Sequence, residues 1–291
     1  MKDYVAVFCI YYSREKWHHF ITKSIIQVFQ EFSLSCEKND INGMLSFGEK
    51  DKCIQLTIYG ISEKLGEVCS NVKEILETYI RNNPSGISMS QKFIPGDVLW
   101  MPAENNAVAI EFLPSEFFFR YPEQILFRQS ITNILLDWFC DDDNISFGNE
   151  DAFSIAIYLQ LVLLNLIVKN KNLIDMGKVF AIIEASMDIS NLENNKDLND
   201  ASKEGYDVNE QMIDESFRSI LPDCAQNSRL KELYDLMESI LNKPRNEDAI
   251  NPNLVVQTMA SIYAQLGIVD LKQLFIHKML RKYYYNHFEQ H

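Results

Sequence analysis

The stretch YVAVFCIYY at residues 4–12 is apolar throughout and rich in β-branched and aromatic side chains. A run of this length and composition predicts a buried strand. Ser13 follows it at the position of a helix cap, and the next apolar residues recur at helical spacing, which predicts a helix over residues 14–32. This apolar stripe consists of Trp17, Phe20, Ile21, Ile25, Val28 and Phe32.

The next segments predict a strand hairpin and a second helix. Residues 44–47 and 53–59 are expected to pair, after a turn at residues 39–43 that is rich in Asn and Gly. Ser62 is expected to cap a helix with one apolar stripe. The opening third therefore runs strand, helix, strand, strand, helix, which places helices on one face of a small, mostly antiparallel sheet.

The rest of the chain consists of a region rich in proline and glycine, followed by a mostly helical region. Residues 84–123 are rich in proline and glycine and predict a connecting region with edge strands, one of them at 107–112. From Gln124 the pattern is helical, except that residues 188–209 are acidic and almost without periodicity, so we expect a mobile surface loop there. The further helices are expected at 152–168, 175–187, 210–221, 228–241, 253–265 and 269–285.

These elements predict an α+β fold, with a small sheet covered by helices and a helix-rich C-terminal half. The sheet region is expected over residues 1–123 and the helical region over 124–291, together forming one integrated domain. With 47% hydrophobic and 23% charged residues in 291, the chain has enough apolar material for a sizeable core. This composition excludes a disordered or fibrous protein.

Charge and cysteine usage narrow the classes of partner. Asp and Glu number 41 against 27 Lys and Arg, for a net charge of −14, which argues against direct binding of nucleic acid. The most apolar stretch, 152–168, is shorter than the roughly 20 residues of a membrane span, so we expect a core helix there. The start of the chain has no signal-peptide pattern, and the six cysteines show no zinc or redox spacing, which indicates thiols in a reducing cytoplasm.

Motifs for common catalytic chemistry are absent from the sequence, but one histidine has a distinctive setting. His277 lies in an expected helix beside cationic residues, which lower its proton affinity and suit it to acid–base work near pH 7. The alternative is a hydrogen-bonded core histidine. The neighbouring basic cluster either holds an anion or forms a solvated face. It consists of Lys272, Lys278, Arg281 and Lys282.

A metal or cofactor is not expected from the sequence. The triplet at 141–143, all Asp, offers carboxylates for a hard cation. It lacks the loop spacing of such sites, so we expect a charged turn that ends a helix.

Several segments carry the motifs of one known family. FLPSEFFFRYPE at 112–123 is similar to its proline-glutamate-x-x-arginine-tyrosine stretch, and IHKMLR at 276–281 to its histidine-methionine-x-x-asparagine-arginine helix. The Trp-His-His helix at 17–19, the strand pair at 44–59 and Ser130 match in order. The chain thus resembles the C-terminal, glutamate-eliminating domain of lantibiotic dehydratases, a family that also occurs as standalone thiopeptide-type bacteriocin biosynthesis proteins.

The resemblance implies an α+β fold and a role in making ribosomal peptide natural products. Full-length members eliminate glutamate from glutamylated Ser or Thr of a precursor peptide, and relatives build the thiopeptide pyridine ring. Carried over by position, His277 becomes the acid or base and Arg120 the arginine that holds an anion. The substrate-binding candidates are Gln55, Lys278, Arg281 and Lys282.

The sequence departs from the family at its charged strand. Where the family has two arginines, residues 53–57 read CIQLT, with Gln55 and no cation. Elimination or cyclisation on a modified precursor peptide is therefore one hypothesis, and a non-catalytic binding or scaffold subunit beside a larger dehydratase is the alternative. The expected partners are the precursor peptide, the larger dehydratase subunit and a second copy of the chain in a homodimer.

Overall fold

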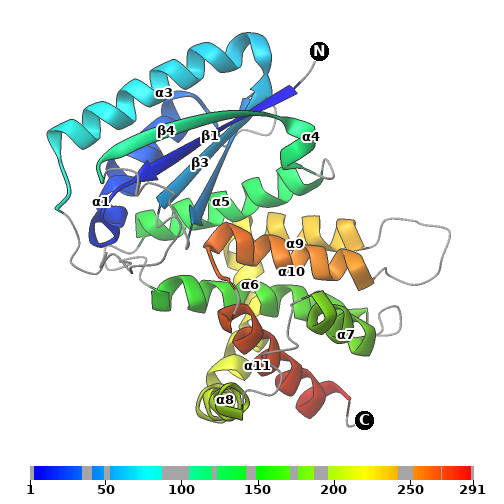
Figure 1. The fold of residues 1–291 in the computed structure, drawn as a ribbon. Helices are drawn as coiled ribbons and strands as arrows, with labels where there is room; N and C mark the ends of the chain where they lie inside the picture. The colour runs from blue at the N-terminus through cyan, green and yellow to red at the C-terminus, as the bar shows by residue number, and fades with distance from the viewer. Residues whose placement is uncertain are drawn as a thin grey trace. The chain divides into compact units, whose positions relative to one another are not determined.

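The computed structural model of the chain divides into two compact units, residues 1–152 and residues 153–291 (Figure 1). The predicted region boundary at residue 123 falls at the start of α5 (Glu123–Asp141), which the structure groups with the first unit. The structure describes residues 3–34, 41–48, 53–86, 105–119, 123–141, 149–170, 176–186, 196–241, 252–269 and 271–289.

The first unit contains a four-stranded antiparallel sheet in the order β2-β3-β1-β4. The opening strand, the hairpin and the strand at 107–112 are thereby confirmed. The turn expected at 39–43 is wrong in its second half, because β2 already begins at Ile41. The strands are β1 (Asp3–Tyr11), β2 (Ile41–Gly48), β3 (Cys53–Ile61) and β4 (Ala107–Pro114).

Gly43 explains the misplaced turn, since this glycine serves close packing. A Cβ atom at this position would lie 2.8 Å from Cβ of Leu34 and 3.0 Å from the ring of Phe29. The backbone N–H of Gly43 also donates to the carbonyl of Leu34 at 3.0 Å. Glycine therefore lets the strand approach the chain that follows the first helical run.

One face of the sheet is formed by alternate residues of β1 and β3. Ala6, Phe8 and Ile10 point to this face and are completely buried, and burying each large side chain contributes roughly 1.5–3 kcal/mol. α3 (Ser62–Asn82) lies over this face in Figure 1. The β3 residues that pair with the three are Ile58, Leu56 and Ile54.

A helical run joins β1 to the hairpin and covers the same face, where Trp17 stacks on Phe47. The sequence predicts one helix over 14–32, and the structure confirms a helical run there but inserts one wide π turn. It consists of η1 (Arg14–Lys16), α1 (Trp17–Phe20), the π segment η2 (Ile21–Ile25) and α2 (Ile26–Glu31).

The opposite face and one edge of the sheet are covered by the segment after β4. α4 (Ser115–Phe118) leads to Phe119, which packs with Val5, Val7 and Met44 of this second face. α5 then closes the β2 edge. Its Thr132 Oγ accepts the backbone N–H of Leu45 at 2.9 Å. A side chain of α5 thus takes the place of a neighbouring strand.

The second unit is helical, and each helix predicted from residue 152 onward is found. α6 is long and apolar enough to cross a membrane, but 61% of that stretch is buried within the structure, as in the core helix of a folded unit. The helices are α6 (Asn149–Lys169), α7 (Met176–Ser186), α8 (Lys196–Gln226), α9 (Ser228–Leu241), α10 (Pro252–Leu266) and α11 (Leu271–Phe288).

α8 corrects one expectation of the sequence. The surface loop expected over 188–209 is helical from Lys196 onward, and residues 188–195 lie outside the described part. The helix also continues through Pro222 to Gln226. Its buried residues recur at intervals of four or seven, a stripe too sparse to stand out in an acidic segment. They are Ser202, Tyr206, Ile213, Ile220 and Cys224.

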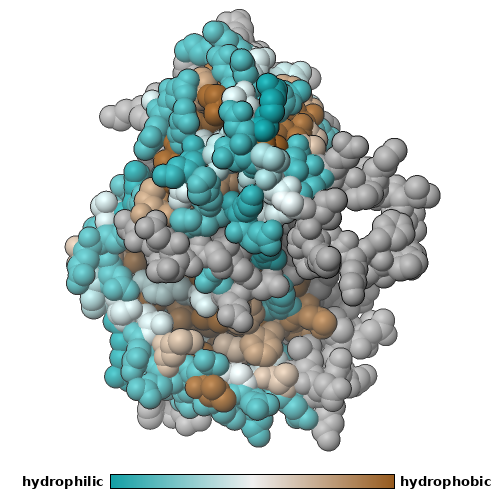
Figure 2. Space-filling view, turned by 90° about the vertical axis from the view of Figure 1, so that its left-hand side faces the viewer, coloured by the Kyte–Doolittle hydropathy of each residue, from teal (hydrophilic) through white to brown (hydrophobic). Residues whose placement is uncertain are grey.

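The surface agrees with the acidic composition. Figure 2 shows a face that is mostly hydrophilic, with hydrophobic residues exposed in several patches. On α8, Val208 and Met212 are among the large apolar side chains that the structure leaves exposed. They are four residues apart and lie on the same face of the helix. Small exposed apolar groups of this kind are ordinary on folded proteins.

Candidate functional site

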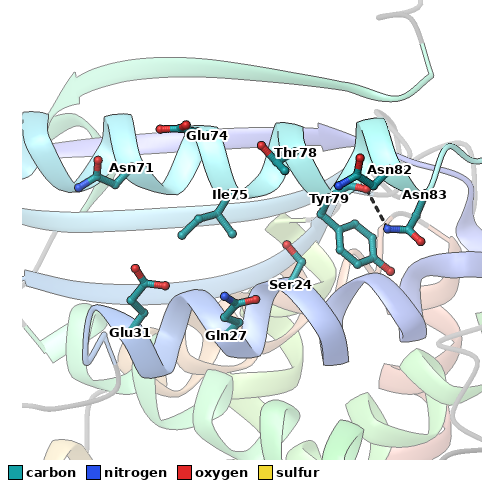
Figure 3. Close-up of a pocket in the computed structure, with 10 residues that line it drawn as sticks. All are labelled: Ser24, Gln27, Glu31, Asn71, Glu74, Ile75, Thr78, Tyr79, Asn82 and Asn83. Atoms are coloured by element: carbon teal, nitrogen blue, oxygen red, sulfur yellow. Dashed lines mark hydrogen bonds between the residues drawn. The ribbon is translucent and has the colours of Figure 1, made fainter.

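A polar groove of about 640 Å³ lies between the first helical run and α3, in the first unit (Figure 3). Its size is typical of ligand pockets. Side chains from the two helices face one another across it, and amide and hydroxyl groups dominate the lining. The lining residues are Ser24, Gln27, Glu31, Asn71, Glu74, Ile75, Thr78, Tyr79, Asn82 and Asn83.

The groove follows from how α3 divides its faces. Its apolar stripe is buried against the sheet, and a second stripe of Asn71, Glu74, Thr78 and Asn82 recurs every three or four residues beside it. The sequence interpretation missed this site because it followed only the apolar stripe. The available signal was the regular spacing of amide, hydroxyl and carboxylate side chains on one helix face.

Ser24 forms part of the floor of the groove. Its side chain is 1% exposed, and its Oγ has no hydrogen-bond partner among the described residues. In Figure 3 this hydroxyl points toward α3. Ser24 lies within the π segment η2, and such wide turns occur frequently at functional sites. A buried hydroxyl without a partner is costly, which marks this position as one that another group can satisfy.

The end of the groove near Tyr79 is held by a hydrogen-bond network. The Tyr79 hydroxyl is hydrogen-bonded to Nδ1 of His19, and the Tyr12 hydroxyl donates to the carbonyl of Asn83. Burial, and secondarily the proximity of Tyr12, raises the pKa of Tyr79 to about 12. The phenol is therefore neutral at physiological pH and acts as a hydrogen-bonding group.

Gln55 lies on the second face of the sheet, away from the groove. It pairs with Cys9 of β1, and Ser46 Oγ donates to its Oε1 at 3.4 Å. All three residues are partly exposed. The structure thus brings Gln55 into a small polar row that offers hydrogen bonds but no charge.

His277 lies in the interior of the second unit. Its ring is 0% exposed and meets the edge of Phe180 of α7, with 5.2 Å between the ring centroids. Burial lowers the pKa of His277 to about 4, with smaller contributions from the nearby Arg281 and Lys278. The imidazole is therefore neutral at pH 7 and out of reach of a peptide in this conformation.

The basic residues around His277 engage the acidic helix α8. Lys278 donates to Oδ1 of Asn199, and Lys282 forms an ion pair with Asp207. Arg281 lies over the ring of Tyr285, 5.6 Å from its centroid. The structure therefore gathers His277, Lys278, Arg281 and Lys282 on α11, whereas Gln55 belongs to the first unit and Arg120 lies outside the described residues.

A comparison with solved structures finds a protein with the same fold. The chain shares the fold of a pyridine synthase. The match is to TbtD from thiomuracin biosynthesis, with a TM-score of 0.67, 13% sequence identity and 100% of both chains covered. At this identity the likeness shows the fold, and the resemblance to the dehydratase domain family stays a prediction. No family model matches the sequence, and no curated protein matches it.

Within this pyridine synthase fold, the described residues provide hydrogen-bonding surfaces. No group of three or more His, Cys, Asp or Glu side chains gathers in that part of the chain to hold a metal ion. The groove has two carboxylates, Glu31 and Glu74, and the second sheet face has the row around Gln55. Both surfaces offer hydrogen-bond donors and acceptors.

Proposed function

We propose that the protein acts in the biosynthesis of a ribosomally made peptide natural product of the lantibiotic or thiopeptide type. Its substrate is a modified precursor peptide, and its reaction is an elimination or a cyclisation. The observation that supports this proposal is the fold shared with a thiomuracin pyridine synthase over the full length of both chains. The motifs at residues 112–123 and 276–281 point to the same kind of pathway.

The proposed chemistry sets requirements for particular side chains. An elimination needs a base for the departing proton and donors or cations for the developing negative charge. In this proposal Gln55 forms hydrogen bonds to the peptide. His277 is the acid–base group, and Arg120 holds the anion. Since His277 is buried, its participation requires α7 and α11 to part at Phe180.

Co-expression with a candidate precursor tests this proposal directly. The peptide encoded nearest to the gene, together with its dehydrating enzymes, is produced with and without the protein and analysed by mass spectrometry. A mass change that depends on the protein supports the proposal, and an unchanged peptide contradicts it. His277→Ala should abolish the change while far-ultraviolet circular dichroism stays native; full activity of that variant would remove His277 from the reaction.

A second candidate function is favoured by the surroundings of His277. Its ring is fully buried, and Lys278 and Lys282 already engage Asn199 and Asp207 of α8. In the described part of α11, the proposed acid–base group His277 is therefore not exposed, and its neighbours Lys278 and Lys282 are already engaged by α8. This arrangement fits a non-catalytic subunit that binds the peptide or a larger dehydratase. Co-purification with that dehydratase, with modification unaffected by His277→Ala, would favour this candidate.

A further inference from the structure

We propose that the groove between α2 and α3 binds a short, extended, positively charged peptide segment. The proposal deepens the function proposed above and rests on it for the source of that segment, the precursor peptide. It assigns recognition to a surface formed by the first unit alone, distinct from the row around Gln55 and from the surroundings of His277.

The charge of the groove selects the sign of its ligand. Glu31 from α2 and Glu74 from α3 are both exposed, and none of the described residues that line the groove is Lys, Arg or His. In Figure 3 the two carboxylates lie toward the same end of the groove, on opposite walls. The net charge of −14 adds a long-range field of the same sign. A Lys or Arg side chain at that end is therefore favoured.

The amides of the groove match a peptide backbone. Asn71, Gln27 and Asn82 each carry one acceptor and a donor group, so they can bond both the N–H and the C=O of an extended chain. From Asn71 to Asn82, α3 rises by roughly 16 Å. This length accommodates about five residues of extended peptide.

Ser24 supplies the observation that separates this groove from an ordinary gap between helices. Its buried Oγ has no partner among the described residues and points toward α3 (Figure 3). Gln27, one turn further along, is exposed. A ligand donor or acceptor that reaches Ser24 would satisfy a hydroxyl that the folded protein leaves unsatisfied.

Binding of a defined probe tests the proposal on the full-length protein. We would titrate the protein into fluorescein-labelled Gly-Lys-Gly-Lys-Gly and measure fluorescence polarisation, with Gly-Glu-Gly-Glu-Gly as the comparison. The lysine peptide should bind and the glutamate peptide should not, and affinity should fall as salt rises from about 20 to 200 mM. Equal binding of both peptides would overturn the proposal.

Matched variants separate the groove from the general acidity of the protein. The double variant Glu31→Gln/Glu74→Gln should weaken the lysine peptide roughly three- to tenfold, as expected for two exposed ion pairs. The control Glu15→Gln/Glu67→Gln removes the same charge from two exposed residues outside the lining. An equal loss of affinity in the two double variants would show that the lysine peptide has no specific site here.

Ser24→Ala provides a test that charge does not influence. It should weaken the peptide roughly fivefold, the value of one hydrogen bond, while the ligand-free protein unfolds at the same temperature or higher. Unchanged affinity with unchanged stability would remove Ser24 from the site.

The precursor assay distinguishes failure of this inference from failure of the proposed function. If Glu31→Gln/Glu74→Gln modifies the precursor as well as the unaltered protein does, the groove is not the recognition site, and the biosynthetic function stands. If the lysine peptide binds in the groove but no precursor is modified, the proposed reaction fails, and the binding site stands.

Discussion

His277 shows how the surroundings of a single side chain decide its protonation. The sequence places it beside cations on a helix, which suggests an accessible acid or base. In the structure, burial against Phe180 has the larger effect, and the adjacent Arg281 and Lys278 act in the same direction. All three factors disfavour the charged imidazolium, so a folded molecule holds this ring neutral well below the usual pKa of histidine.

This burial predicts a loss of stability in mild acid. The pKa of His277 is about 4 in the folded protein and 6.5 in the unfolded chain, so below pH 6.5 the unfolded state binds a proton that the folded state does not. The free energy of unfolding should therefore fall between pH 6.5 and 4, by on the order of 3 kcal/mol from this residue. Urea unfolding of the unaltered protein and of His277→Phe at several pH values measures the difference; parallel pH profiles would contradict it.

Thr132 is the residue by which α5 closes the sheet, and its hydroxyl can be tested separately from its methyl group. Thr132→Val should lower the free energy of unfolding by about 1–3 kcal/mol, because the buried N–H of Leu45 loses its acceptor. Thr132→Ser keeps the hydroxyl and should cost at most about 1 kcal/mol. Denaturant unfolding gives both values, and equal losses would show that packing alone matters at this position.

The two candidate sites differ in how much of each could be predicted from the sequence. The environment of Lys278 and Lys282 is set by Asn199 and Asp207, which lie more than seventy positions away, so no local pattern identifies these partners. The polar stripe through Asn71 and Thr78, by contrast, is visible in the sequence once α3 is placed. Which polar stripe faces a second helix depends on packing, which periodicity alone does not determine.

At the scale of elements, apolar periodicity predicts most helices and strands correctly. β1 and the hairpin were found because their side chains are buried on the sheet, which leaves a strong pattern. For α8 (Lys196–Gln226) the sequence predicts only residues 210–221, because its first half buries single residues such as Ser202 and Tyr206. A helix with only one buried residue in every four to seven shows little apolar periodicity in its sequence.

Two glycines in different elements predict opposite effects of the same substitution. Gly43→Ala in β2 should lower the free energy of unfolding by about 1–3 kcal/mol, because the new methyl group meets Leu34 and Phe29. Gly66→Ala in α3 should raise it by about 0.5–1 kcal/mol, because that site is open and alanine favours the helix. Thermal unfolding of both variants tests the pair, and a stable Gly43→Ala protein would contradict the packing around β2.

For the molecule as a whole, we expect the net charge to affect the stability of the fold more than any individual ion pair does. The net charge of −14 makes like charges repel across the folded surface. Exposed pairs such as Lys169–Glu238, whose Nζ and Oε1 lie 2.7 Å apart, contribute at most about 1 kcal/mol each.

Screening should therefore stabilise the protein. The midpoint of thermal unfolding should rise between about 20 and 200 mM sodium chloride, because salt should weaken the overall repulsion more than it weakens the attraction within exposed ion pairs. A series with sodium sulfate at equal ionic strength controls for effects of the anion. A midpoint that falls with added salt would mean that the ion pairs dominate.

The closed border of the sheet also constrains how two copies of this chain could join. α5 occupies the β2 side through Thr132, whereas β4 has a bonded neighbour on one side only among the described residues. Phe112 on β4 remains 53% exposed beside that border. In the described part of the chain, a dimer built by strand pairing would therefore join the two copies of β4 antiparallel, about a two-fold axis perpendicular to the sheet, with each Phe112 near the seam.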